Sequence, residues 1–539
     1  LEVNIKCATN SYNYSSYKAV SKNEDLTSET KSSSTADQSV VYITESGKVI
    51  SGSTLTKESG DSSNTENSEF YGVNAAVLVN GGGLTMTDGT ITTKAKGANA
   101  VVATNNGNVK ITGTEITSTG SGSARGLHAT YGGKIEASNV KITTQGGSCA
   151  TLATDRGEGT VTCTECTLST AGAGSPLIYS TGDITVSKTT GTATGAQAVV
   201  IEGKNTATVK ESSNLKCNGN PNRKDADKCG IMLYQSMSGD AASGTSTFNC
   251  DKSTIEIQSS SSVYSSAPMF FITNTQAKIN LAECTFKYGS GVFLNAAGTS
   301  EWGNSGSNGG VVTLTLTNQD IEGDIVVDAY SGLTINLISS TITGKINTAN
   351  TAAKIAISMD EDSSIILTGN SYYTSLVNEK TDGSNLVNGT YKWTSSAEKE
   401  IKTSTGNNNN QSPGGQAPNG QPPSNMPNGN FQPPNGSSDQ PNGMPPQMPN
   451  GNGQPPNGSD GMFNGQPPNG SNGMPNGQPP SGSDFPNGQP PNGASDGGNN
   501  GNSNGQPPNG NGVSNDDDEE IPEGLEKYIN NSSGISSSS

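Results

Sequence analysis

The chain has 539 residues, of which 29% are apolar and only 14% are charged, and its net charge is −18. Strong helix formers are scarce and β-branched Thr, Val and Ile are plentiful, which argues against a helical protein. The acidic balance argues against a nucleic-acid partner, because phosphate backbones need basic patches. No apolar run approaches the roughly 20 residues of a transmembrane segment. Because the chain begins at Leu1, we expect that a signal peptide or tag has been removed.

Residues 1–70 precede a long repeat and contain short strand-like stretches at 40–43 and 48–50. The first unit of a repeat exposes an unpaired strand edge unless other residues cover it. We therefore predict that 1–70 form an N-terminal cap together with the first strands.

Residues 71–400 repeat a pattern of three short strands separated by Gly- or Asn-rich turns. Apolar runs open successive units about every 25 residues, at 76–79, 100–103, 126–129, 150–153, 176–179 and 199–201. Within one unit, alternating strands follow at 109–112 and 115–117. Three strands per unit of this length are typical of a β-helix coil, and alternation lets one apolar residue in two build the core. The pattern predicts an all-β, right-handed parallel β-helix (a solenoid).

Later units carry the same openings at 230–233, 268–271 and 291–294, with loops inserted near 217–229 and 236–265. From residue 311 the units shorten to about 21 residues. We expect the runs at 311–314, 333–336 and 354–357 to open these shorter coils.

Residues 401–539 form a low-complexity region rich in Pro, Asn, Gly and Gln. Only three of the 27 prolines precede it, and GQPPNG recurs at 465–470 and 505–510. Such a composition buries too little apolar surface to offset the entropy of ordering. We predict a disordered tail with local polyproline II structure.

Several phrases carry a family resemblance: SARGLHATYGG at 123–133, ATDRGEG at 153–159, SPLIYSTG at 175–182, YQSMSGD at 234–240 and TSEWGNSG at 299–306. Over roughly residues 70–395 the chain resembles secreted right-handed parallel β-helix proteins of gut and rumen Firmicutes and anaerobic fungi. Those proteins are described as adhesin-like or carbohydrate-binding. The resemblance implies an extracellular or cell-surface location and a glycan partner.

Eight cysteines suggest disulfides in such a location. Cys217 and Cys229 flank an inserted loop and are the pair that we expect to be bridged. Cys163 and Cys166 form a Cys-x-x-Cys motif that could indicate zinc or redox chemistry. Because no second such motif exists and the only histidine is distant in sequence, a stacked-coil disulfide or buried thiols are the favoured interpretation.

Aligning the coils on Ala103, Ala129 and Ala153 brings the turns after the first strands into one lateral row, since parallel strands stack about 4.8 Å apart. That row contains Tyr131, Asp155, Arg156, Glu158, Asp183, Glu202 and Lys204. Aromatic faces stack on sugar rings and charged groups bond sugar hydroxyls, so we predict ligand binding here. The alternative is a surface turn with a local ion pair. Its carboxylates make Ca²⁺ the one cofactor considered, and no metal or catalytic residue is assigned.

Three further residues stand out. His128, the only histidine, lies in a strand and is expected to be packed, with Arg125 pointing to the opposite face. Trp302, in a polar Gly-rich loop, is a candidate ligand-binding residue that could stack on a sugar; burial under the loop is the alternative.

The sequence thus predicts a secreted or surface β-helix that binds polysaccharide or a cell-surface glycan, or mediates adhesion, without catalysis. One alternative is a polysaccharide lyase or glycoside hydrolase that uses the carboxylates of the lateral row. Another is a structural surface or matrix protein.

Overall fold

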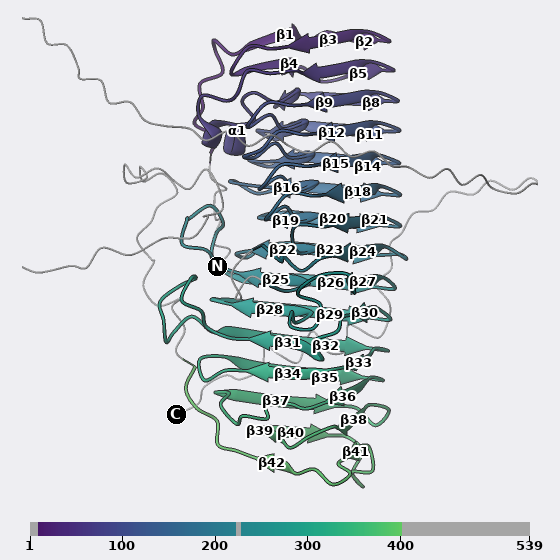
Figure 1. The fold of residues 1–539 in the computed structure, drawn as a ribbon, viewed down its shortest axis with the longest axis vertical. Helices are drawn as coiled ribbons and strands as arrows, with labels where there is room; N and C mark the ends of the chain where they lie inside the picture. The colour runs from purple at the N-terminus through teal and green to yellow at the C-terminus, as the bar shows by residue number, and fades with distance from the viewer. Residues whose placement is uncertain (1–8, 223–227, 402–539) are drawn as a thin grey trace, which may run out of the picture. The chain divides into compact units, whose positions relative to one another are not determined.

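The computed structural model describes residues 9–222 and 228–401, and the predicted tail lies outside these residues except for residue 401. The described chain is a parallel β-helix, as predicted, in which successive coils stack on one another (Figure 1). Most coils contribute one strand to each of three long sheets, which we name A, B and C.

Sheet A has 12 strands: β1 (Lys18–Lys22), β4 (Gln38–Ile43), β7 (Val77–Asn80), β10 (Val101–Thr104), β13 (Leu127–Ala129), β16 (Leu152–Thr154), β19 (Ile178–Ser180), β22 (Val199–Glu202), β25 (Ile231–Tyr234), β28 (Phe270–Thr273), β31 (Val292–Ala296) and β34 (Asp324–Val327). Sheet B has 14 strands: β2 (Leu26–Thr27), β5 (Lys48–Ser51), β8 (Gly83–Thr87), β11 (Asn108–Thr112), β14 (Gly133–Ser138), β17 (Gly159–Thr164), β20 (Asp183–Ser187), β23 (Thr206–Lys210), β26 (Thr245–Asp251), β29 (Thr275–Ala282), β32 (Gly310–Thr317), β35 (Gly332–Ile338), β37 (Lys354–Met359) and β40 (Ser375–Asn378).

Sheet C has 10 strands: β3 (Thr30–Ser33), β6 (Thr54–Lys57), β9 (Thr90–Thr93), β12 (Glu115–Ser118), β15 (Lys141–Thr144), β18 (Thr167–Thr170), β21 (Thr190–Ala193), β24 (Asn214–Cys217), β27 (Thr254–Ile257) and β30 (Thr285–Lys287). Two small sheets complete the described strands. Sheet D has four strands, β33 (Asp320–Glu322), β36 (Thr341–Gly344), β38 (Ser364–Leu367) and β41 (Leu386–Val387), and sheet E pairs β39 (Ser371–Tyr373) with β42 (Trp393–Ser395).

Alternation of side chains explains how so polar a chain folds. In β26 and β29 every second residue is buried, and these inward residues join one continuous core cluster along the coils. Because the core is a narrow column, half of the residues in each strand can stay polar.

Sheet A differs from the other sheets because its outer face is also covered. The outward residues stack in register from Tyr42 through Leu78, Val102, His128, Ala153, Tyr179, Val200 and Met232 to Phe271. They pack against residues outside the sheet in two separate clusters, one around Val102 and one around Met232. Because these strands are buried on both faces, their sequences are continuous apolar runs and do not alternate between apolar and polar residues.

The single helix of the described residues, α1 (Thr65–Tyr71), lies over part of this outer face. The side chain of Asn64 caps its first turn by accepting from the backbone N–H of Glu66. Gly72, at φ 72°, ends it in the left-handed conformation that glycine adopts without a steric penalty.

Two alignments made from the sequence were wrong. Ala129 pairs with Thr154, and Ala153 pairs with His128, so this coil is shifted by one residue and Ala153 faces outward. The runs at 311, 333 and 354 belong to sheet B, because the loop after β31 delays the return to the next coil. Residues 1–70 already contain two coils, β1 to β6, which pair directly into the three long sheets.

The stack of strands is interrupted on one side. Sheet C ends at β30, whereas the strand at the equivalent place in the next coil, β33, begins sheet D. Sheets A and B continue past this level. We call this interruption the sheet break.

Candidate functional site

The lateral row predicted from the sequence is largely covered by the protein itself. Tyr131, Asp155 and Glu202 are buried, with exposed fractions of 7%, 3% and 1%. Tyr131 stacks on Tyr71 of α1, with ring centroids 5.8 Å apart. The row is therefore not an open surface, because α1 and the loop after β25 lie on it. The ligand-binding role of these residues stays a prediction.

A buried charged cluster joins α1 to sheet A. The Arg125 guanidinium binds the carboxylate of Asp155 at 2.8 Å and also pairs with Glu69 of α1. His128 lies against the same guanidinium, 3.3 Å from each ring nitrogen, so the expectation that Arg125 points away from it was wrong. His128 is three positions after Arg125, and Arg125 lies before β13 begins, so strand alternation does not fix its direction.

The His128 ring also contacts the backbone oxygen of Glu69 at 2.6 Å, and we assign Nε2 as the donor. Burial and the adjacent Arg125 charge lower the pKa of His128 to about 3. His128 is therefore neutral at physiological pH and packed, as expected.

Glu202 ends β22 in a second buried network. Its carboxylate accepts hydrogen bonds from the hydroxyls of Tyr179 at 2.6 Å and Tyr234 at 2.9 Å, and from Ser236. Burial raises the pKa of Glu202. Three hydroxyl groups donate to this carboxylate, and the bond from Ser236 ties the loop after β25 to sheet A.

Three of the other row residues, Arg156, Glu158 and Lys204, are partly exposed and ion-paired. Arg156 binds Asp240 at 2.7 Å and lies over the ring of Phe70, and Lys204 binds Glu158 at 2.8 Å. Asp183 is exposed at the start of β20. The row thus contains the local ion pairs of the alternative interpretation.

Trp302 is half-buried and packs edge-on against Tyr234, with ring centroids 4.9 Å apart. It belongs to the outer cluster around Met232. The ring therefore helps the Gly-rich loop to cover sheet A. Its use in sugar stacking stays a prediction.

The predicted bridge between Cys217 and Cys229 is absent. Cys217 is a buried thiol inside the coil, whereas Cys229 packs in the cluster outside sheet A. The disulfide of the described residues joins Cys250 to Cys284 instead. The inserted loop therefore runs from a core position at the end of β24 in sheet C to a position outside sheet A.

The sheet break holds an open groove that the sequence analysis did not identify. Two adjoining pockets of about 740 and 550 Å³ share Phe286, Asp320, Ile321, Glu322 and Thr343. We call their combined space the sheet-break groove. Its rim is solvent-exposed at Lys287, Gly289, Gly291, Asp320 and Glu322.

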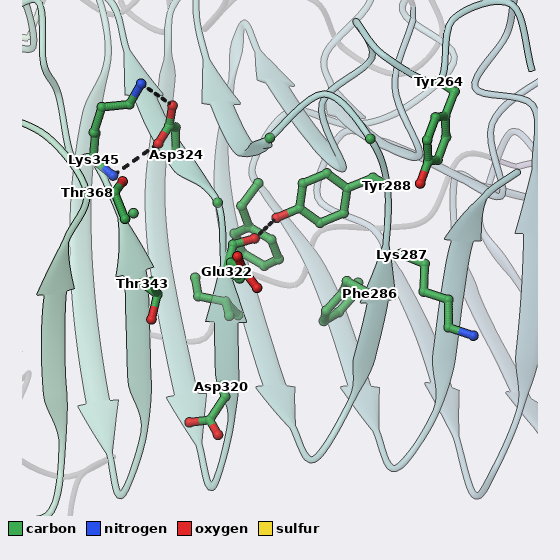
Figure 2. A pocket seen from close by; sticks show the side chains of 16 residues that line it. Tyr264, Phe286, Lys287, Tyr288, Asp320, Glu322, Asp324, Thr343, Lys345 and Thr368 are labelled. Atoms are coloured by element: carbon green, nitrogen blue, oxygen red, sulfur yellow. Dashed lines mark hydrogen bonds and ion pairs between the residues drawn. The ribbon is translucent and has the colours of Figure 1, made fainter. Parts of the chain in front are cut away.

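Aromatic residues build one side of the sheet-break groove. Tyr264, Phe286 and Tyr288 line it, and all three are only partly buried (Figure 2). Phe286 packs on Phe293 of β31, with ring centroids 5.5 Å apart. Tyr264 lies so close over the backbone of Gly289 that a Cβ there would meet the ring.

Tyr288 explains why the break persists. Its hydroxyl donates to the backbone oxygen of Glu322, on the edge of β33 that faces the groove. In an unbroken sheet a strand N–H would occupy that position. The tyrosine therefore satisfies a backbone acceptor on the open edge of β33 and lies between β30 and β33.

Carboxylates form the opposite side. Asp320 and Glu322 are two residues apart on β33, so both side chains lie on the same face of the strand, and both are exposed. Asp324 lies beyond them and binds Lys345 at 2.8 Å. Aromatic rings thus face carboxylates across an open groove.

Neither a metal site nor a membrane span accompanies this groove in the described residues. No group of three or more His, Cys, Asp or Glu there is arranged to hold a metal ion. Within 9–222 and 228–401, no helix is both long and apolar enough to cross a bilayer.

Comparisons with protein-family models, with curated proteins and with solved structures gave no match.

Two signals in the sequence pointed to the groove. The coil length falls from about 25 to about 21 residues just after this level, and the aromatic residues Phe286, Tyr288 and Phe293 gather in one short stretch. The pairing of that stretch with Asp320 and Glu322 depends on where sheet C ends, which spacing alone does not show.

Proposed function

We propose that the protein is a secreted or cell-surface β-helix that binds polysaccharide in the sheet-break groove without cleaving it. The observation that carries the proposal is the pairing of partly exposed rings, Tyr264, Phe286 and Tyr288, with the exposed carboxylates Asp320 and Glu322. Sugar rings present apolar C–H faces to aromatic side chains and hydroxyl edges to carboxylates, so one ligand can use both sides.

An open groove on the side of a solenoid suits a polymer, because a long chain can enter without threading. The disulfide between Cys250 and Cys284 supports an oxidising, extracellular setting. Adhesion would follow if the bound polysaccharide belongs to a surface.

The burial of two carboxylates of the lateral row argues against catalysis at that row. An acid–base pair must reach its substrate, but Asp155 and Glu202 are buried and held by Arg125 and by hydroxyl groups. A lyase or hydrolase would instead release sugar products from its substrate.

The test is a glycan array followed by calorimetry on the full chain, with product assays for reducing ends and unsaturated sugars. Tyr264→Ala removes a stacking face and should weaken binding by on the order of 1 kcal/mol or more. Tyr391→Ala, which truncates a tyrosine that is 42% exposed outside the groove, is the matched control and should bind normally.

Absence of binding to every glycan would contradict the proposal. So would unchanged affinity in folded Tyr264→Ala and Tyr288→Ala variants. Release of sugar products would instead support the enzymatic alternative.

A further inference from the structure

We propose that the sheet-break groove selects its glycan by charge and takes amino-sugar polymers, which carry ammonium groups, in preference to neutral or uronic-acid polymers. This inference rests on the proposed function, because it assumes that the groove binds a glycan. It adds the chemical class of that glycan.

The first observation is that two carboxylates in the groove have no cation of their own. Asp320 and Glu322 are exposed, and neither forms an ion pair with another described residue. Their backbone positions on one strand place them about 7 Å apart along it, since a strand rises about 3.3 Å per residue. Two unpaired anions therefore line one wall.

The second observation concerns the cations nearby. Lys345 is already bound to Asp324 at 2.8 Å. Lys287 lines the groove, but its side chain extends away from Asp320 and Glu322 (Figure 2). No lysine of the lining therefore neutralises the pair on β33.

The charge balance of the whole lining agrees. Four carboxylates line it, Glu283, Asp320, Glu322 and Asp324, against the two lysines Lys287 and Lys345. Asp324 pairs with Lys345, and Glu283 pairs with Lys252 beside the groove, so the unpaired negative charge lies on Asp320 and Glu322. The chain as a whole carries −18. The net charge of the chain would repel a polyanion at a distance, and the groove carboxylates would repel it at contact. A polycation would be attracted by both.

An amino sugar satisfies both walls at once. Its ring can stack on Tyr264 or Phe286, while its ammonium group donates to Asp320 or Glu322 across the groove. Hydrogen bonds between an ammonium and a carboxylate are stronger than those between neutral groups, so the charged sugar gains an interaction that its acetylated form lacks.

The experiment compares three oligomers of six residues by calorimetry on the full chain at about pH 6: glucosamine, N-acetylglucosamine and galacturonic acid. We expect the glucosamine oligomer to bind about tenfold tighter than the acetylated one at low salt, with no binding of the galacturonic acid oligomer. High salt should reduce this preference, because the groove is exposed and its charges are screened.

The deciding variant is the double change Asp320→Asn with Glu322→Gln. It should lower affinity for the glucosamine oligomer to that of the acetylated oligomer and change the latter by less than about twofold. Glu361→Gln with Asp362→Asn neutralises two exposed carboxylates outside the groove and should leave the preference intact.

Equal affinity for the charged and acetylated oligomers would overturn the charge inference and leave the proposed function standing, provided that Tyr264→Ala still weakens both. Tighter binding of the galacturonic acid oligomer, or an equal loss in the control variant, would also overturn it. If none of the three oligomers nor any glycan on the array binds, the proposed function itself fails.

Discussion

A single guanidinium, that of Arg125, holds two carboxylates and a histidine beneath α1. Its side chain is 6% exposed, and its partners Glu69 and Asp155 belong to a helix and to the turn after β16. The sequence marked Arg125 and His128 as noteworthy but separated them. Their meeting depends on α1, whose seven residues carry no long periodic signal and whose position is set by contacts distant in sequence.

His128 makes folding sensitive to acid. Its pKa is about 3 in the folded chain, below the usual value near 6.5, so between these pH values only the unfolded state takes up the proton. The stability that His128 contributes is present above pH 6.5 and is lost as pH falls towards 3. The slope should approach about 1.4 kcal/mol per pH unit.

The measurement is the difference in free energy of unfolding between the native chain and His128→Gln, followed from pH 7 to pH 4. The difference should shrink as pH falls, because glutamine does not titrate. A difference independent of pH would contradict the prediction, because it would show that folding leaves the pKa of His128 unchanged.

At the scale of elements, α1 is held to sheet A by charge as well as by ring stacking. Arg125→Met should leave the carboxylates of Glu69 and Asp155 without a cation and cost about 3–5 kcal/mol, because an uncompensated buried charge is expensive. Denaturant unfolding gives the cost, and hydrogen exchange at 65–71 reports whether α1 loosens.

Lys141→Met is the matched control, since it breaks an exposed pair with Glu115 whose side chains are 62% and 54% accessible. It should cost less than about 1 kcal/mol. Equal losses in both variants would mean that the buried pairing adds nothing beyond an ordinary surface pair.

The corner between β17 and β18 contains a second candidate disulfide. The sulfur atoms of Cys163 and Cys166 lie 2.8 Å apart, and both residues are buried in the core. We expect them to be linked in protein folded under oxidising conditions, with glutathione disulfide as the oxidant that takes up the two electrons.

Alkylation in denaturant without reductant, followed by peptide mapping, checks this pairing. Cys163 and Cys166 should escape alkylation, while Cys217, a buried thiol in the native coil, should be modified once unfolded. Alkylation of both members of the Cys163–Cys166 pair would contradict the prediction. The result also decides between a disulfide and buried thiols at this Cys-x-x-Cys motif, the two interpretations favoured over zinc.

For the whole molecule, the period of the apolar runs was enough to predict the β-helix. The prediction succeeded because three strands per coil, each with every second side chain inward, place apolar residues at regular intervals along the sequence. The predicted row failed as an open surface because coverage of sheet A comes from α1 and from the loops after β25 and β31. Those segments do not follow the repeat, so the spacing of the apolar runs does not predict where they pack.

The sheet break also bears on how the molecule holds together along its axis. In a solenoid each coil is stabilised by its neighbours, so cooperativity passes from one interface to the next. Between β30 and β33 the ladder of sheet C is missing, and only sheets A and B carry the connection. Fewer interstrand hydrogen bonds join the coils at this level, and hydrogen exchange should divide there into two cooperative blocks.

A polymer seated in the sheet-break groove would contact both blocks, through Tyr264 and Phe286 on one side and through Asp320 and Glu322 on the other. Binding would then connect the two blocks. The backbone amides of the coils from β33 onward should exchange more slowly when the groove is filled. In that case the interruption of sheet C would both create the ligand site and let the bound ligand set how strongly the solenoid resists a pulling force.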